Sequence, residues 1–254
     1  MVSDPTRRFS NRVENYVKYR PGYPPGIINL LQAECGLTGG SIVADVGSGT
    51  GLLAILFLKN GNDVFGVEPN AEMREAGEQL LQDYTHFHSI DGRAEDTTLP
   101  DGSVNFVTAG QAFHWFDREQ ARTEFLRILQ PPGWIVLVWN ERRITGNPFQ
   151  EAYEELVQTY GKDYAEVNHR QVDESALGAF FNQGYAEQTF QNAQTFDFTG
   201  LRGRLLSSSY VPEAGDPGHE EMLTELEAIF SSFADHGYVT IQYDTRVYYG
   251  RVVG

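Results

Sequence analysis

Residues 45–51 read DVGSGTG and lie between an apolar run, SIVADV at 41–46, and a longer apolar segment, GLLAILFLKNG at 51–61. The first run has the length and composition of a buried strand, and the second has those of a helix. Gly47 and Gly49 lack a Cβ, so the chain can turn sharply and a ligand can approach the backbone. A glycine turn between a strand and a helix is typical of the ligand-binding edge of a doubly wound α/β sheet.

The rest of the central region continues this alternation of strands and helices. The expected strands are 41–46, 63–68, 86–92, 103–110 and 134–140, and the expected helices are 51–61, 70–82 and 118–129. Asn70 and Asp117 stand where N-caps are expected, and PPG at 131–133 is predicted to form a turn. Near-continuous apolar strands favour a parallel sheet with helices on both faces.

The segments on either side of this region predict further helices and two long strands. The expected helices are 9–19, 25–35, 148–160, 173–182, 201–211 and 219–237, and the expected strands are 186–198 and 238–252. RPGYPP at 20–25 separates the first two helices because proline disfavours a helical residue before it. Neither a repeat nor a low-complexity linker divides the chain, so we expect one domain.

The composition indicates an acidic globular protein that acts on small molecules. The formal net charge is −16 and 41% of the 254 residues are hydrophobic, which disfavours binding along a nucleic-acid backbone. The one cysteine, Cys35, cannot form an internal disulfide or a cysteine-rich zinc site. Neither a signal peptide nor a membrane-spanning segment is predicted, so we expect a cytoplasmic protein.

Glu68 ends the predicted strand at 63–68, and its carboxylate can accept hydrogen bonds from both hydroxyls of a ribose. The glycine turn reads G-x-G-x-G, whereas a dinucleotide turn reads G-x-G-x-x-G, and it holds no basic residue for a diphosphate. The pattern therefore favours a nucleoside cofactor without phosphate over NAD, although a helix N-terminus alone can hold phosphate. A structural turn with an exposed glutamate is the alternative.

With this glycine turn and this acid, the sequence resembles class I S-adenosylmethionine-dependent methyltransferases. DVGSGTG followed by VFGVEPNAEM (64–73) is similar to the first two motifs of that family, and QAFHWFD (111–117) with RILQPPGWIVLVWNE (127–141) is similar to its fourth and fifth strand region. FSNRVENYVKYRPGYP (9–24) resembles small-molecule methyltransferases of the trans-aconitate and ubiquinone-biosynthesis type. YVTIQYDTRVYYGRV, at the C-terminal end, resembles their closing strand.

The resemblance implies a Rossmann-like, doubly wound, seven-stranded, mostly parallel sheet with an antiparallel C-terminal strand and a helical cap. It divides the single domain into four parts. Residues 1–40 would form N-terminal helices and a lid, and 41–147 the cofactor-binding core. Residues 148–237 would form a cap with the acceptor site, and 238–254 the closing strand. S-adenosylmethionine is the cofactor that it implies.

The resemblance also implies which residues bind that cofactor. The expected set is Arg20, Asp45, Gly47, Ser48, Gly49, Glu68, Pro69, Met73, Ala94, Glu95 and Gln111. The glycine turn and Asp45 would hold the methionine part, Glu68 the ribose, and Glu95 the adenine amine, with Asp96 as an alternative. Arg20 would pair with the cofactor carboxylate.

The acceptor would meet Tyr23, His114 and Trp115, and His114 is the candidate general base, with a packing role as its alternative. No metal is expected, because His86 and His88 share a strand face near Asp91 without a convincing third ligand.

The predicted function is methyl transfer to a small-molecule acceptor, with a carboxylate among the candidates. A carboxylate would need a cation, and the sequence does not choose among Arg142, Arg143, Arg202 and Arg204. Tyr153, Tyr160, Phe180, Phe181, Tyr185 and Tyr210 could line the acceptor pocket or belong to the core. The competing hypotheses are a non-catalytic cofactor-binding protein and an NAD-dependent oxidoreductase. No nucleic-acid or membrane partner is expected, and the protein would act as a monomer or homodimer.

Overall fold

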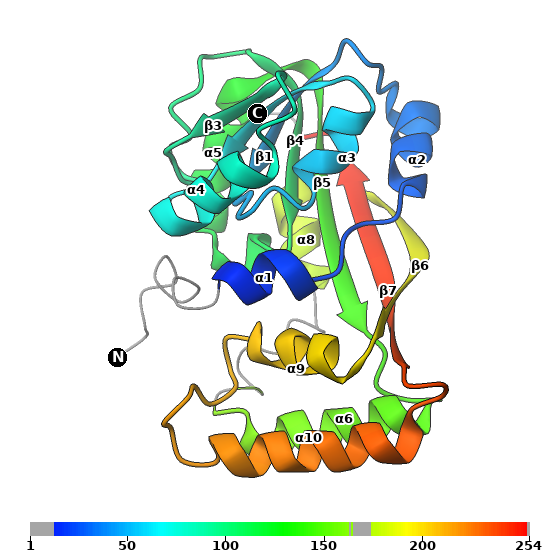
Figure 1. Ribbon diagram of the computed structural model, residues 1–254. Helices are drawn as coiled ribbons and strands as arrows, with labels where there is room; N and C mark the ends of the chain where they lie inside the picture. Colours follow the sequence, from blue (N-terminus) through cyan, green and yellow to red (C-terminus); the bar gives the residue numbers. More distant parts are fainter. Residues whose placement is uncertain (1–12, 163, 165–173, 253–254) are drawn as a thin grey trace.

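The computed structural model describes residues 13–162, 164 and 174–252, and a seven-stranded sheet runs through them (Figure 1). The strands are β1 (Ile42–Val46), β2 (Asp63–Val67), β3 (Phe87–Ile90), β4 (Val104–Gly110), β5 (Leu129–Arg142), β6 (Ala186–Phe196) and β7 (Val239–Gly250). Their order in the sheet is β3-β2-β1-β4-β5-β7-β6. The first five strands are parallel, whereas β7 pairs antiparallel with both β5 and β6. The expected Rossmann-like sheet with its antiparallel C-terminal strand is confirmed.

Helices cover this sheet and form a cap beyond one end of it (Figure 1). They are α1 (Val13–Tyr19), α2 (Gly26–Cys35), α3 (Ala54–Lys59), α4 (Ala71–Leu80), the short 3-10 helix η3 (Phe113–Trp115), α5 (Arg118–Ile128), α6 (Pro148–Tyr160), α8 (Glu174–Phe181), α9 (Phe198–Leu206) and α10 (His219–Phe233). Both predicted caps are confirmed, because the Asn70 side chain accepts from Met73 N–H and that of Asp117 accepts from Gln120 N–H.

Chain order places a topological switch beside the glycine turn. β1 has β2 on one side and β4 on the other, so the chain leaves β1 in one direction and later returns to its opposite flank. Loops that follow β1 and β4 therefore diverge, and a crevice forms outside the carboxyl ends of these strands. The turn at 47–51 starts at that crevice.

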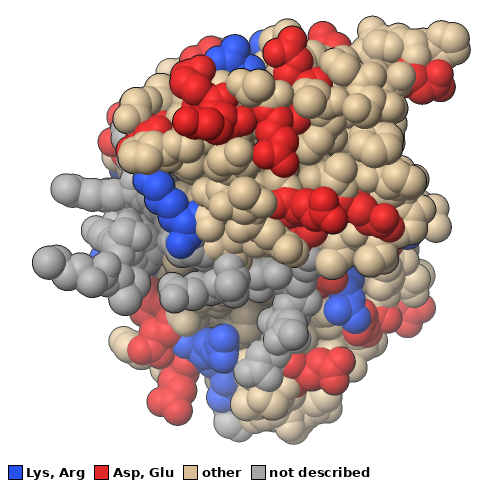
Figure 2. Space-filling view, turned by 90° about the horizontal axis from the view of Figure 1, so that it is seen from below, with Lys and Arg blue, Asp and Glu red and all other residues tan. Residues whose placement is uncertain are grey.

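The cap contains α6, α9 and α10 and lies below the sheet in Figure 1, with α1 between the two. Its hydrophobic cluster includes Leu156, Leu201 and Leu226, and the ends of β6 and β7 contribute Phe196 and Ile241. The face turned toward the viewer in Figure 2, seen from below, shows more Asp and Glu than Lys and Arg, which fits the net charge of −16.

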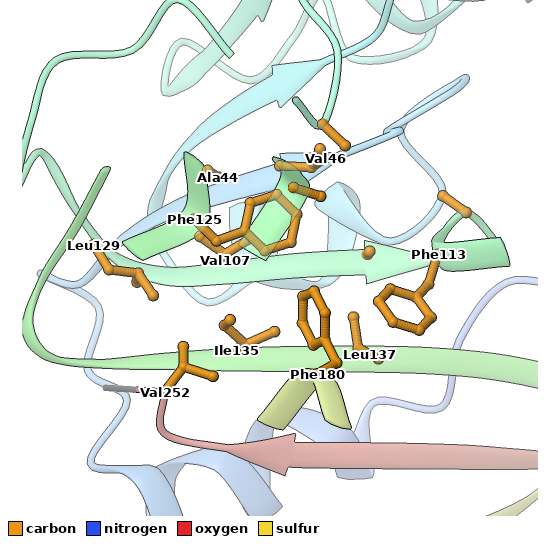
Figure 3. Packing of buried hydrophobic residues seen from close by; sticks show 14 of the residues in the cluster. Ala44, Val46, Val107, Phe113, Phe125, Leu129, Ile135, Leu137, Phe180 and Val252 are labelled. Carbon is orange, nitrogen blue, oxygen red and sulfur yellow. The ribbon is translucent and has the colours of Figure 1, made fainter. Parts of the chain in front are cut away.

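The apolar residues of the sheet form one hydrophobic cluster on each face. Phe125 on α5 lies over β4 near Val107, and Phe180 on α8 lies over β5 near Ile135 and Leu137 (Figure 3). The rings of Phe125 and Phe180 meet edge to face with centroids 6.0 Å apart. The opposite face buries residues of α2 and α3. Because both faces are covered, the central strands can be apolar throughout.

Three sequence predictions are corrected by the structure. The PPG segment is not a turn but part of β5: Val104 pairs with Leu129 and Phe106 with Trp134, so residues 130–133 are extra length in the strand opposite a single residue of β4. The helix expected at 201–211 is α9, which starts earlier because the Asp197 side chain accepts from Gly200 N–H.

The helix expected at 219–237 ends at Phe233. His236 and Gly237 have positive φ, and Asp235 and Tyr238 exchange backbone hydrogen bonds, so a tight turn replaces the last helical turn and leads into β7. Residues 9–12 of the expected first helix, and residue 173 of the helix expected at 173–182, lie outside the described residues. Within the described ranges, every helix is too short or too polar to cross a membrane.

The packing of Phe125 predicts a large loss of stability when its ring is removed. Phe125→Ala should lower the free energy of unfolding by about 3–5 kcal/mol, because the residue is fully buried and its cavity would be lined by rings that cannot collapse into it. Urea denaturation measures the change. Phe233→Ala, at a side chain that is 40% exposed, is the control and should cost less than about 1 kcal/mol. Equal losses in the two variants would contradict the role of Phe125 in the core.

Candidate functional site

A cleft of about 720 Å³ lies at the carboxyl ends of β1, β2, β3 and β4. Its lining residues follow these strands directly, apart from Tyr16 on α1. They are Tyr16, Gly47, Gly49, Glu68, Pro69, Asn70, Met73, Arg93, Ala94, Glu95, Asp96, Gly110, Gln111, Ala112, Trp115, Phe116, Asp117 and Gln120. The cleft has the position of a ligand site in a doubly wound sheet and a volume suited to a small organic cofactor.

The glycine turn forms one wall, and its backbone requires glycine. Gly47 and Gly49 have φ values of 67° and 55°. A Cβ on Gly47 would meet the Ala112 Cβ at 2.6 Å, so a side chain there would collide with the opposite wall. The N–H groups of Gly47 and Ser48 donate to the Val67 carbonyl at 2.8 and 3.1 Å, which holds the turn against the end of β2.

Glu68 is held in the cleft by the backbone on both sides. Gly49 N–H donates to its Oε2 and Asn70 N–H to its Oε1, both at 2.9 Å. Burial raises the pKa of this carboxyl, and the two N–H groups oppose the rise. Each carboxylate oxygen can accept more than one hydrogen bond, so Glu68 can receive two further donors, such as vicinal hydroxyls.

Asp45 lies at the end of β1 and is 1% exposed. The Thr108 hydroxyl donates to its Oδ1 at 2.8 Å, whereas Oδ2 has no partner within hydrogen-bond geometry. Burial raises the pKa of the Asp45 carboxyl to about 7, and the Thr108 hydroxyl and the nearby Ala54 N–H oppose that rise. Asp45 is not among the cleft-lining residues, but its neighbours in the turn are.

Gln111 follows β4 in a strained backbone conformation, with φ at 56°. Its N–H donates to the Val138 carbonyl at 2.9 Å and its side-chain Nε2 to the Asn140 carbonyl at 3.1 Å, so two bonds to β5 fix it. Its Oε1 is buried without a hydrogen-bond partner, and the residue lines the cleft. Strained residues with an unused acceptor are typical of ligand sites.

The far wall comes from the loop after β3 and the start of α5. Ala94 is buried, and the Glu95 carboxylate accepts from Asp117 N–H at 2.8 Å, which ties the two segments together. Asp96, the alternative to Glu95 in the sequence prediction, also lines the cleft. Pro69 and Met73 complete this wall, as the sequence predicts.

Arg20 and Tyr23 lie beside the cleft but are not lining residues. Arg20 Nη2 donates to the Ser207 carbonyl at 2.8 Å, and its guanidinium stacks on the Tyr16 ring with 5.0 Å to the centroid. A Cβ on Gly110 would meet the Tyr23 hydroxyl oxygen at 2.5 Å, so Tyr23 packs against the end of β4. Both residues remain predictions as ligand contacts.

Ser48 and His114 also lie outside the lining set. A Cβ on Gly66 would meet the Ser48 Oγ at 3.1 Å, so that side chain packs against β2. Both ring nitrogens of His114 are buried, and its ring lies 4.6 Å from that of Trp115, which does line the cleft. The base role of His114 remains a prediction.

Sequence reasoning missed several lining residues. Tyr16 belongs to the segment that carries the resemblance, Phe116 and Asp117 end the QAFHWFD motif, and Gln120 follows it closely, so membership of these motifs or proximity to them was an available signal. Arg93 directly precedes the predicted Ala94 and Glu95, so proximity was a signal for this residue as well.

His86, just before β3, and His88, within it, face Asp63. His86 Nδ1 and His88 Nε2 lie 3.0 and 3.5 Å from its Oδ1, whereas Asp91 pairs with Arg74. Within residues 13–162, 164 and 174–252, no group of three or more His, Cys, Asp or Glu side chains is arranged to hold a metal ion.

Comparisons with known proteins agree with this geometry. The family model for the methyltransferase domain matches residues 44–137, which carry the glycine turn, Glu68 and the β4 end. An uncharacterized methyltransferase of Schizosaccharomyces pombe is 27% identical over 89% of this chain and 88% of its own length. One of Mycobacterium tuberculosis is 36% identical over 55% of this chain, which spans 54% of that relative's length. A protein of Anaeromyxobacter dehalogenans, provisionally named a type II methyltransferase, shares the fold with a TM-score of 0.67 at 18% identity, over 92% of this chain and 99% of its own.

The strand order gives this chain the fold of class I methyltransferases, and the part that matches the methyltransferase-domain model, residues 44–137, builds most of the cleft at the switch point.

The raised pKa of Asp45 predicts a pH-dependent loss of stability. Between about pH 4 and pH 7 the folded protein keeps a proton on Asp45 that the unfolded chain has released, so stability falls as the pH rises and is constant above about 7. Across that window the free energy of unfolding of the wild type should fall by at most about 4 kcal/mol more than that of Asp45→Asn, which has no carboxyl at this position.

Urea denaturation at pH 5 and pH 8 checks this prediction. The exposed Asp83→Asn variant is the control and should follow the wild type at both pH values. A difference between wild type and Asp45→Asn that is the same at pH 5 and pH 8 would contradict the prediction.

Proposed function

We propose that the protein transfers a methyl group from S-adenosylmethionine to a small-molecule acceptor in the cleft. The observation that carries this proposal is the Glu68 carboxylate, which is buried, held by two backbone N–H groups and still able to accept further hydrogen bonds beside the glycine turn. A ribose with two vicinal hydroxyls matches those free acceptor positions.

The remaining walls fit the other parts of the cofactor. The unpartnered Asp45 Oδ2 and Gln111 Oε1 are acceptors suited to an ammonium group, directly or through water, and both are close to the glycine turn or β4 end. Pro69, Met73 and Ala94 offer apolar contact for an adenine ring, and Glu95 could accept from its amine. Gly47 and Gly49 line the cleft in backbone conformations that a side chain would strain, so their backbone can lie against the methionine chain.

Bound S-adenosylmethionine supplies an electrophilic methyl group on its sulfonium. The protein must then align the acceptor atom with that carbon and keep water away. Gln111 and Trp115 lie where the acceptor would enter, after β4, and Tyr23 packs beside them. These three residues position the acceptor in this proposal.

A carboxylate is the acceptor group that we favour, in line with the resemblance to the trans-aconitate and ubiquinone-biosynthesis type. A carboxylate is already ionised at neutral pH and needs no general base. With a carboxylate acceptor, His114 shapes the pocket by packing against the Trp115 ring. With a hydroxyl or amine acceptor, His114 would act as the general base.

Glu68→Gln should weaken binding of S-adenosylhomocysteine by about tenfold to a hundredfold, because hydrogen bonds to a charged acceptor are lost. Isothermal titration calorimetry measures the affinity. Glu72→Gln, at an exposed glutamate on the adjacent helix α4, is the matched control and should bind as the wild type does. Wild-type affinity in Glu68→Gln would show that the ribose assignment is wrong.

Methyl transfer itself is tested with labelled S-adenosylmethionine and a panel of carboxylate, hydroxyl and amine acceptors. A methylated product is expected from at least one carboxylate. Binding of S-adenosylhomocysteine without any product would favour a non-catalytic binding protein. Tight binding of NAD without binding of S-adenosylhomocysteine would favour an oxidoreductase instead.

A further inference from the structure

Three arginines from distant parts of the sequence meet around Tyr210, where α1 adjoins the cap. Arg20 ends the N-terminal segment, Arg142 ends β5, and Arg204 lies on α9. The Arg204 residue is 6% exposed and the Arg142 side chain 7%, while Arg20 is half-buried. We call these three arginines and Tyr210 the cap cluster.

The partners of Arg204 are neutral. Its Nε donates to the Tyr243 hydroxyl at 3.2 Å, and its Nη1 donates to the hydroxyls of Ser208 at 3.2 Å and Ser207 at 3.5 Å. Hydroxyl oxygens solvate a guanidinium but do not neutralise it. Burying a charge without a counter-charge is costly, so a buried cation of this kind points to a partner of opposite charge.

The other two arginines are partly unsatisfied. Arg142 pairs with Glu154 at 2.5 Å, yet its Nη1 is buried without a hydrogen-bond partner. Arg20 donates from Nη2 to the Ser207 carbonyl, and its Nε is likewise buried and unpartnered. In the part of the chain that the structure describes, Glu154 is the one carboxylate that pairs with the cluster, so three cations face one anion.

The pKa of the Tyr210 phenol reflects the positive potential of these arginines. Burial alone would raise the pKa of its phenol, but the charges of Arg204, Arg142 and Arg20 outweigh burial and lower it. Hydrogen bonds show the same convergence, because Arg20 and Arg204 both donate to Ser207 and Arg142 donates to the hydroxyl of Tyr164. The rings of Tyr153 and Tyr164 flank the cap cluster, with Arg142 over the Tyr153 ring at 4.9 Å and the Tyr164 and Tyr210 centroids 4.9 Å apart.

We propose that the cap cluster binds an anionic oxyacid group, carboxylate or phosphate, of the methyl acceptor. The inference rests on the proposed function, because it assigns the acceptor's binding site. Planar guanidiniums pair with such groups through two parallel hydrogen bonds, and the unpartnered nitrogens of Arg20 and Arg142 provide donors. The surrounding tyrosine rings suit an aromatic or apolar body next to the acid group.

The cluster adjoins the cofactor cleft through α1. Arg20 stacks on Tyr16, which lines the cleft, and the charge of Arg20 also acts on the phenol of Tyr23 beside the β4 end. In this proposal the acid group binds Arg204 and Arg142, and the rest of the acceptor points toward Tyr16, the residue that belongs to the cleft and contacts the cluster.

The structure distinguishes the four arginines that the sequence offers as cations for a carboxylate acceptor. Arg143 is bound to Asp244 at 2.6 Å on the surface, and Arg202 on α9 is exposed. Arg142 and Arg204 are the buried pair.

The test compares anions with a neutral analogue on the full chain saturated with S-adenosylhomocysteine. Calorimetry at constant ionic strength measures binding of phenylacetate, phenyl phosphate and phenylacetamide to the wild type, Arg204→Gln and Arg202→Gln. The wild type should bind at least one of the two anions and not the amide. Arg204→Gln should bind that anion at least about tenfold more weakly, and Arg202→Gln, two residues away on the same helix, should match the wild type.

S-adenosylhomocysteine affinity is measured in every variant and should stay within about twofold of the wild type. Arg204→Lys keeps the charge, guards against loss of folding in Arg204→Gln, and should give intermediate anion affinity because the planar fork is missing. A preference for phenylacetate identifies a carboxylate, and one for phenyl phosphate a phosphate.

Two results would overturn the cap-cluster proposal while leaving the proposed function intact. One is a wild type that binds S-adenosylhomocysteine but neither anion, and the other is anion affinity unchanged in both Arg204 variants. A wild type that fails to bind S-adenosylhomocysteine would instead reject the proposed function, which separates the two failures.

Discussion

The hydrogen bonds from Gly49 and Asn70 to Glu68 are the interaction on which the site depends. They join the turn after β1 to the end of β2 and to the N-cap residue of α4, so three segments share one carboxylate. Asn70 in turn caps α4 through Met73 N–H, and Met73 contacts the turn from the other side, near Gly49. A cofactor wall is thereby built from backbone geometry, with little dependence on mobile side chains.

A second set of contacts fixes the N-terminal segment over the sheet. The Asn140 and Asn192 side chains both donate to the Gly22 carbonyl, at 3.2 and 2.8 Å, and Gln194 donates to that of Tyr19. Amides on β5 and β6 therefore position the loop that carries Arg20 and Tyr23. This anchoring brings α1 between the cleft and the cap, where one helix can contribute to both sites.

The sequence predicted the central fold well because its signals are local. Apolar runs, glycine turns and the caps Asn70 and Asp117 each act within a few residues, and all were confirmed. PPG at 131–133 misled because proline usually ends a strand, whereas here Leu129 before it and Trp134 after it both pair with β4 and carry the strand through the unpaired stretch. The cleft residues from the turn, from the β2 end and from the loop after β3 were predictable, because parallel strands bring their carboxyl ends to one edge.

Long-range packing decided the rest. Local patterning and the order of the motifs were enough to predict a doubly wound sheet with a glycine turn facing an acid. Each of these features depends on residues within or beside the element that it forms. Contacts between segments more than a hundred residues apart decided the position of Arg20 and the burial of the other arginines. The hydrogen bond from Arg20 to Ser207 is one such contact. The burial and charge of a side chain are properties of everything that surrounds it, and no window of sequence contains those surroundings.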